Sequence, residues 1–238
     1  MALKPLHGER IFHYIFKVAL LVGSIAYFAM ASDLGWAVIP QANEQDRGDS
    51  RQIFYAKYVY WVVSFPSAIL SLGLISGVSW ATIAFNIVLS WIWVVSYLVS
   101  AFTMTNYKWG FFAFGTVAFF SLAFVLLTAG RTSAARVGSS GHYTILAGWT
   151  CFLWFLYPIA FGLSDGGNRI GVTSGFIFFG ILDLLTIPLL AFATIFLSRK
   201  WDYGKLNLHF TQYGRVTQGG HVVEKGPASG GVTGETAA

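Results

Sequence analysis

Charged residues and cysteines are scarce in this sequence of 238 residues, and each scarcity excludes a class of protein. Only 11% of the residues are Asp, Glu, Lys or Arg, whereas 55% are hydrophobic, and the mean hydropathy is +0.62. A soluble globular domain has about 25% charged residues, so this composition indicates a polytopic membrane protein. The single cysteine, Cys151, excludes an internal disulfide.

Signatures of catalysis and of nucleic-acid binding are also lacking. The sequence has no phosphate-binding glycine loop and no nucleophile elbow. The histidines have no paired spacing of the metal-ligand kind; they are His7, His13, His142, His209 and His221. The formal charge of +5 is spread between the apolar runs and the C-terminal segment, which is not a nucleic-acid signal. We therefore expect no enzyme, no metal site and no nucleic-acid partner.

Six apolar runs are long enough to cross a bilayer at about 1.5 Å per helical residue. They cover residues 11–32, 53–75, 80–102, 109–127, 143–163 and 170–197. The sequence thus predicts an all-α membrane protein with a transmembrane helix bundle over residues 1–198. Residues 199–238 are rich in Gly, Ser and Thr, so we expect a largely disordered cytoplasmic tail there.

Basic residues are more frequent on one side of the predicted spans. An even number of spans puts both termini on the side with Lys4, Arg10, Arg131, Arg136, Arg199, Lys200 and Lys205. The opposite side has Arg47, Arg51, Lys108 and Arg169. The positive-inside rule therefore predicts that both termini are cytoplasmic. Among the connections, residues 33–52 are long and polar, and residues 130–142 are basic and predicted to be flexible.

Asp183 is the one acidic residue well inside an apolar run. A carboxylate at the centre of a membrane costs about 2.5–3.5 kcal/mol on insertion scales, so it needs a partner. We expect Lys57 to neutralise it and Tyr60 or Tyr157 to donate hydrogen bonds, which makes these four residues a buried polar cluster. Two other interpretations stay open: a buried pair that only fixes helix register, and a Lys57 side chain that snorkels to the membrane surface.

Three motifs, in order along the chain, resemble those of microbial (type I) rhodopsins. They are Lys57-Tyr-Val-Tyr60-Trp61-Val-Val-Ser64-Phe-Pro66, Trp154-Phe-Leu-Tyr157-Pro158 with Phe161, and Leu182-Asp183 followed by position 187. They are similar to the family's third helix, sixth-helix retinal pocket and seventh helix. Three further stretches resemble fungal opsins and opsin-related proteins: Gly8-Glu-Arg-Ile-Phe-His-Tyr, Ala26-Tyr-Phe-Ala-Met-Ala-Ser-Asp-Leu-Gly35 and Tyr107-Lys-Trp-Gly110.

The resemblance implies a microbial-rhodopsin-like bundle in which the family's first helix is missing from the six spans. Either the protein is a natural six-helix variant or its start lies inside a longer gene. The resemblance also implies a vestigial retinal pocket lined by Trp61, Ser64, Tyr97, Trp154, Tyr157, Phe161 and Asp183.

Departures from the family pattern argue against light-driven pumping. Ile187 stands at the position of the retinal-binding lysine and has no amine for an imine, so covalent retinal is excluded and no cofactor is expected. Tyr60 and Ser71 occupy the proton-acceptor and proton-donor positions, and neither titrates near neutrality as a carboxylate can. Lys57 replaces an arginine, and Tyr97 falls where pumps have a glycine near the retinal ring.

The resemblance to the heat-shock membrane proteins of fungi leads to our main functional expectation. It is a retinal-free, stress-associated plasma-membrane protein that acts through the lipid bilayer and a membrane partner such as a plasma-membrane proton ATPase. A further expected partner is a second copy of the same chain, in a homo-oligomer. The alternative is a non-covalent binder or sensor of a small apolar ligand in the vestigial pocket. A light-driven ion pump or channel ranks last.

Overall fold

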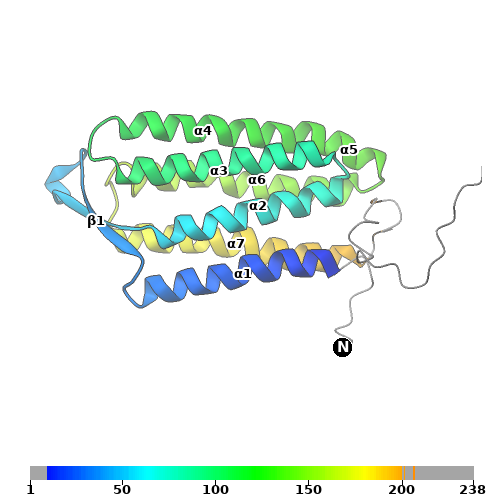
Figure 1. The fold of residues 1–238 in the computed structure, drawn as a ribbon, viewed down its shortest axis with the longest axis horizontal. Helices are drawn as coiled ribbons and strands as arrows, with labels where there is room; N and C mark the ends of the chain where they lie inside the picture. Colours follow the sequence, from blue (N-terminus) through cyan, green and yellow to red (C-terminus); the bar gives the residue numbers. More distant parts are fainter. Residues whose placement is uncertain (1–9, 200, 202–205, 207–238) are drawn as a thin grey trace, which may run out of the picture.

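Six long helices run side by side, and a β-hairpin lies across one end of the bundle (Figure 1). The computed structural model describes residues 10–199, 201 and 206. The elements are α1 Arg10–Ala31, β1 Trp36–Pro40, a 3-10 turn Gln45–Arg47, β2 Ser50–Phe54, α2 Ala56–Ser76, α3 Trp80–Phe102, α4 Lys108–Val125, a π-helical segment Leu126–Gly130, α5 Arg131–Arg136, α6 Ser140–Leu163 and α7 Val172–Ser198.

The prediction of six membrane-spanning helices is confirmed. Within the described residues, six helices are long and apolar enough to cross a membrane, and the fourth runs without a break from Lys108 to Arg136. The start of the second span was predicted too early. Residues 53 and 54 belong to β2, so α2 begins at Ala56 and Lys57 lies in its first turn. Of the tail predicted over residues 199–238, all but residues 199, 201 and 206 lies outside the described part of the chain.

Two connections are more ordered than the sequence predicted. The long polar connection 33–52 contains most of an antiparallel hairpin, in which Trp36 of β1 is opposite Phe54 of β2. The basic connection 130–142, expected to be flexible, is partly helical. Its α5 continues α4 through the π-helical segment, where the Leu126 carbonyl accepts a hydrogen bond of 2.7 Å from the Tyr143 hydroxyl.

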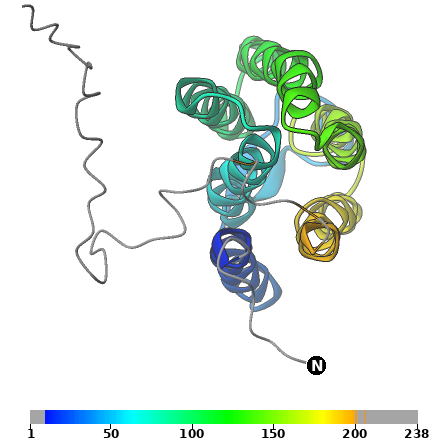
Figure 2. The same cartoon turned by 90° about the vertical axis from the view of Figure 1, so that its right-hand side faces the viewer.

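The α2 helix lies in the middle of the bundle, in contact with α1, α3, α5, α6 and α7 (Figure 2). It ends at Gly77, whose φ of 66° is in the left-handed region that glycine adopts without strain. The next helix, α3, is capped by Ser79, whose hydroxyl accepts the backbone N–H of Thr82 at 3.2 Å. This tight turn sets α2 and α3 side by side.

The two ends of the bundle differ in content. The hairpin end carries β1, β2 and the α6–α7 connection, residues 164–171, whereas the terminal end carries the start of α1, α5 and the end of α7 (Figure 1). The start of α1 and the end of α7 therefore lie at the same end, as an even number of spans requires. Among the described residues, the buried charged groups lie at the hairpin end, apart from Asp183 near the middle of α7.

Candidate functional site

The mid-bundle cluster consists of Asp183 on α7 and three donors from three other helices. Asp183 is 2% exposed. One carboxylate oxygen accepts the Tyr27 hydroxyl of α1 at 2.5 Å. The other accepts the indole N–H of Trp61 at 2.8 Å and the Tyr157 hydroxyl at 2.7 Å. One carboxylate thus ties α7 to α1, α2 and α6.

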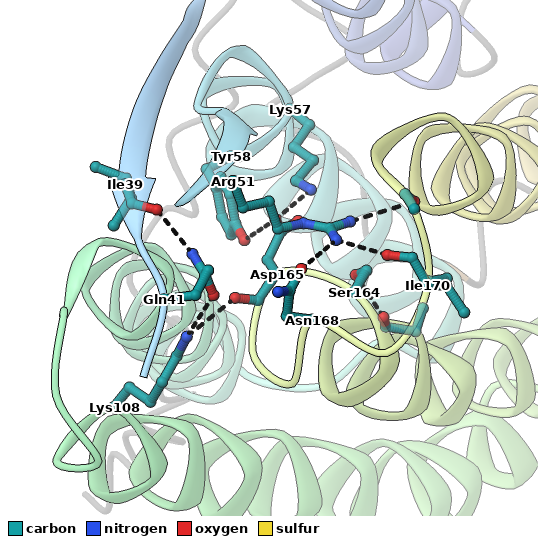
Figure 3. Close-up of polar contacts among 12 residues, drawn as sticks. Ile39, Gln41, Arg51, Lys57, Tyr58, Lys108, Ser164, Asp165, Asn168 and Ile170 are labelled. Carbon is teal, nitrogen blue, oxygen red and sulfur yellow. Dashed lines mark hydrogen bonds and ion pairs between the residues drawn. The ribbon is translucent and has the colours of Figure 1, made fainter. Parts of the chain in front are cut away.

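The hairpin-end cluster consists of Asp165, Arg51, Lys57, Tyr58 and Lys108 (Figure 3). Asp165 lies in the α6–α7 connection and forms an ion pair with Lys57. Its same oxygen accepts the Tyr58 hydroxyl at 2.8 Å, and its other oxygen lies 3.6 Å from Arg51 Nε. All four charged groups are buried, the most exposed being Lys57 at 7%. This is an ionic site without a water-exposed member.

The predicted ion pair between Lys57 and Asp183 is wrong, because Lys57 pairs with Asp165 instead. The reason is depth. Lys57 lies in the first turn of α2 at the hairpin end, whereas Asp183 lies about 16 Å along α7 from its first residue, Val172, at about 1.5 Å per residue. The prediction of a hydrogen bond from Tyr157 to Asp183 is confirmed. Tyr60 lines the same groove as Asp183. The hydrogen bonds to the Asp183 carboxylate come from Tyr27, Trp61 and Tyr157.

Asp165, Arg51 and Lys108 were not singled out as site residues from the sequence. Asp165 follows the fifth apolar run in the polar stretch Ser164-Asp165-Gly166-Gly167-Asn168, which is typical of an exposed loop. The usable signal was the set of cations on the hairpin side of the predicted spans. A buried cation needs a counter-charge, and Asp165 is a carboxylate on the same side.

The hairpin and the α6–α7 connection hold each other in place. Arg51 on β2 donates to the Asn168 side chain at 3.2 Å and to the backbone carbonyls of Ile170 at 2.6 Å and Gly171 at 3.4 Å. Asn168 donates in return to the Glu44 carbonyl at 3.3 Å. These bonds fix the α6–α7 connection, and with it the position of Asp165, which lies near the start of the connection.

Burial and charge act in opposite directions on Asp165. Burial by itself raises the pKa of this carboxyl, but attraction by Lys57 and Arg51 and hydrogen bonds from Lys57 and Tyr58 outweigh it. The pKa of Asp165 therefore lies below its ordinary value, and the group is ionised at neutral pH. Burial lowers the pKa of Arg51, which the charge of Asp165 partly opposes; a guanidinium still keeps its proton at neutral pH.

The predicted pocket residues do come together in the core, but as a packed aromatic cluster. All seven are buried: Trp61, Ser64, Tyr97, Trp154, Tyr157, Phe161 and Asp183. Trp61 and Tyr157 have ring centroids 5.3 Å apart, and Tyr97 and Phe161 have theirs 4.6 Å apart.

Two further aromatic residues, not predicted from the sequence, add to this packing. Phe65 of α2 lies 4.9 Å from Trp93 of α3 and 5.1 Å from Trp154 of α6, measured between ring centroids. Tyr97 packs close to the α3–α4 contact, where a Cβ at Gly115 would come within 2.7 Å of its ring. Ile187, at the position of the expected lysine, is 1% exposed. Large aromatic rings therefore occupy the interior of the bundle beside α7, the helix that carries Ile187.

A groove of about 310 Å³ runs between α1 and α7. Its wall includes the small residues Gly23 and Gly180, which let it reach inward to Tyr27, Tyr60 and Asp183. The outer wall is apolar, and Leu184 is 63% exposed. The carboxylate of the mid-bundle cluster thus lies at the inner side of a groove that opens on the flank of the bundle.

Six apolar helices, an aspartate buried in the last of them and a core of stacked aromatics define a membrane protein with the microbial-rhodopsin fold. The chain belongs to the bacteriorhodopsin-like family, because the family model described as "Bacteriorhodopsin-like protein" matches residues 7–199. The resemblance drawn from the three sequence motifs is confirmed.

Known relatives place the chain among fungal opsin-like proteins. It is 39% identical over 206 residues to the opsin-like protein carO of Fusarium fujikuroi, with 84% of this chain and 67% of carO covered. It is 29% identical to the 30 kDa heat shock protein of Saccharomyces cerevisiae, with 84% of this chain and 67% of that protein covered. The structure of the light-driven proton pump LR (Mac) from Leptosphaeria maculans matches with a TM-score of 0.75 at 30% identity, over 81% of this chain and 84% of that one.

Proposed function

We propose that the protein is a retinal-free, stress-associated opsin relative that acts by contact with another integral membrane protein. The observation that carries the proposal is Ile187. This buried aliphatic side chain stands one helical turn after Asp183 and has no amine that retinal can bind. The rings of Trp93 and Tyr97 support the same conclusion, since they pack where a chromophore would need space.

The groove between α1 and α7 supports a helix as the contacting element. It is open along the flank that faces lipid in a membrane-spanning bundle, and Gly23 and Gly180 allow a close approach of another backbone. Ser24 and Tyr27 supply hydroxyls inside the groove. Small residues beside a few polar groups favour helix association in a bilayer. The proposed occupant is a transmembrane helix of the partner.

The proposed association with stress is supported by the names of similar fungal proteins. One similar protein is named a 30 kDa heat shock protein. The resemblance to that branch makes a plasma-membrane proton ATPase the first partner to test.

We further propose the plasma membrane as the location, with both termini in the cytoplasm. The basic residues of the terminal end, among them Arg131 and Arg136 of α5, support that orientation. No enzymatic chemistry is assigned to the protein.

Site-specific photocrosslinking in stressed fungal cells tests the proposal. A photoreactive phenylalanine analogue is placed at Leu184 in the groove, or as a control at Phe114 on α4, which is 69% exposed. In Figure 2, α4 lies on the opposite side of the bundle from α1. We expect Leu184 to crosslink to a discrete membrane protein and Phe114 to crosslink to lipid. Equal patterns from the two positions, or no protein adduct from Leu184, would contradict the proposal.

A second candidate function is the non-covalent binding of a small apolar ligand. The groove of about 310 Å³ favours it, because Asp183 and Tyr60 would give a polar end to an otherwise apolar site. Thermal unfolding of the purified protein with retinal and other isoprenoids tests this candidate. A saturable rise in the unfolding temperature would favour it over partner binding. Light-driven pumping or conduction ranks below both, because Tyr60 and Ser71 stand where pumps carry carboxylates.

A further inference from the structure

We propose that the hydrogen bond between Trp201 and His142 is a pH-sensitive latch, which docks the chain after α7 onto the terminal end of the bundle and releases it in acid. Trp201 follows the end of α7, and its backbone N–H donates to the Ser198 carbonyl at 3.1 Å. Its indole N–H donates to Nδ1 of His142, in the first turn of α6, at 2.8 Å. The bond thus joins the last described segment of the chain to a helix that begins well before it.

Apolar packing holds the same segment in place. The Trp201 ring meets the ring of Phe12 on α1 edge-on, with centroids 5.6 Å apart and planes at 74°. Phe12 is 0% exposed. Leu206, further along the chain, is 4% exposed and belongs to the hydrophobic core of the bundle. Because Trp201 packs on Phe12, its release would uncover apolar surface at the start of α1.

The bond requires that Nδ1 of His142 carry no proton. An indole nitrogen can only donate a hydrogen bond, so the nitrogen that it faces must accept one. Protonation makes both imidazole nitrogens donors, which sets two N–H groups against each other. The Trp201 ring offers the added charge no compensation, because the edge of an aromatic ring is its positive side. Histidine is the side chain that ordinarily changes charge between about pH 5 and pH 8, so the bond is lost in that range.

The surroundings of His142 include no carboxylate that would hold an imidazolium in place, among the residues that the structure describes. The titratable groups at the terminal end are Arg10, His13, Tyr14 and Lys17 on α1, Arg131 and Arg136 on α5, Tyr143 on α6 and Arg199 after α7. The described carboxylates lie at the hairpin end or, for Asp183, near the middle of α7. His142 also lies at the amino-terminal end of α6, whose partial positive charge repels a cation. An added proton therefore opposes docking both through the lost bond and through repulsion.

The test uses the full-length protein in detergent, with 5-fluorotryptophan in place of tryptophan, and fluorine NMR. Trp201→Phe identifies the Trp201 resonance by its loss, and an uncharged, water-soluble gadolinium chelate broadens the resonances of rings that water reaches. Loss of one hydrogen bond shifts an equilibrium by about two- to tenfold, so we expect the broadening at Trp201 to rise about threefold from about pH 7.5 to about pH 5.5. The resonances of Trp93 and Trp154, which are 1% and 0% exposed, should not change.

His142→Gln separates the latch from general effects of acid. The glutamine amide oxygen accepts from the indole at either pH, so the broadening at Trp201 should stay low throughout. The rise should persist in His13→Gln, which removes the other described histidine of this end. It should also persist in Glu9→Gln and Asp202→Asn, which remove carboxylates that precede Arg10 and follow Trp201 in the sequence.

Three results would overturn the inference. The first is equal broadening of the Trp201 resonance at the two pH values in the unsubstituted protein. The second is a rise that survives in His142→Gln. The third is loss of the rise in any of the three control variants, because the switch would then belong to another group. The inference concerns the terminal end alone and does not depend on the function proposed above.

Discussion

The two buried aspartates of this bundle are satisfied in opposite ways. Asp183 receives its hydrogen bonds from two tyrosines and a tryptophan, none of which carries a charge. Asp165 lies against two cations and one tyrosine. The difference shows what each site requires. Removing the charge of Asp165 leaves cations unpaired, whereas removing that of Asp183 leaves only neutral donors.

The largest predicted effect is therefore at the hairpin end. Asp165→Asn would leave Lys57 and Arg51 buried without their carboxylate, and breaking a buried ion pair in this way costs about 3–5 kcal/mol. We expect a loss of this size in the free energy of unfolding, measured by denaturant titration in detergent. Glu44→Gln is the matched control, because its pair with Arg169 is at the surface and contributes about 0–1 kcal/mol.

Asp183→Asn should cost much less, about 1 kcal/mol. The amide oxygen of asparagine can still accept from Trp61 and Tyr157, and the Tyr27 hydroxyl can accept from the amide nitrogen. The same titration compares the two variants directly. A loss at Asp183 as large as that at Asp165 would mean that the mid-bundle site also depends on ionic charge.

The smallest predicted effect is the dependence of stability on acid. The pKa of Asp165 is lower in the folded protein than the ordinary value of about 3.9, so its stabilisation is complete above about pH 5. That stabilisation is lost as the pH falls through the lowered folded value. Unfolding temperatures measured from pH 6 down to pH 3 should decline more steeply for the unsubstituted protein than for Asp165→Asn. Parallel curves of unfolding temperature against pH for the two proteins would show that ionisation of Asp165 does not stabilise the folded state.

The sequence predicted the helices well, because a bilayer imposes a length and a composition that each span must show on its own. It predicted the pairing at Asp183 less well. Tyr157 was identified as a donor, but Lys57 was assigned to the wrong carboxylate. The true partner, Asp165, lies in a connection with the composition of an exposed loop. Its burial depends on the hairpin, where Arg51 bonds to the α6–α7 connection, and such long-range contacts leave no periodic pattern in the sequence.

The predicted pocket shows a second limit of sequence reasoning. Trp61, Trp154, Tyr157 and Phe161 were assigned to one lining, and the structure does bring them into one core. Whether these residues enclose a cavity depends on which other side chains pack between them. Tyr97 was recognised as a filling group, whereas the neighbouring Trp93 was not, because a tryptophan in an apolar run is common in any membrane helix.

The central claim is that this opsin relative has lost both the attachment point and the space for retinal. Absorption spectra with all-trans retinal test it most directly. The unsubstituted protein and Ile187→Lys alone should give no shifted visible band, whereas Ile187→Lys combined with Trp93→Leu and Tyr97→Gly should give one. A full pigment from Ile187→Lys alone would contradict the account, because it would show that the pocket is still open.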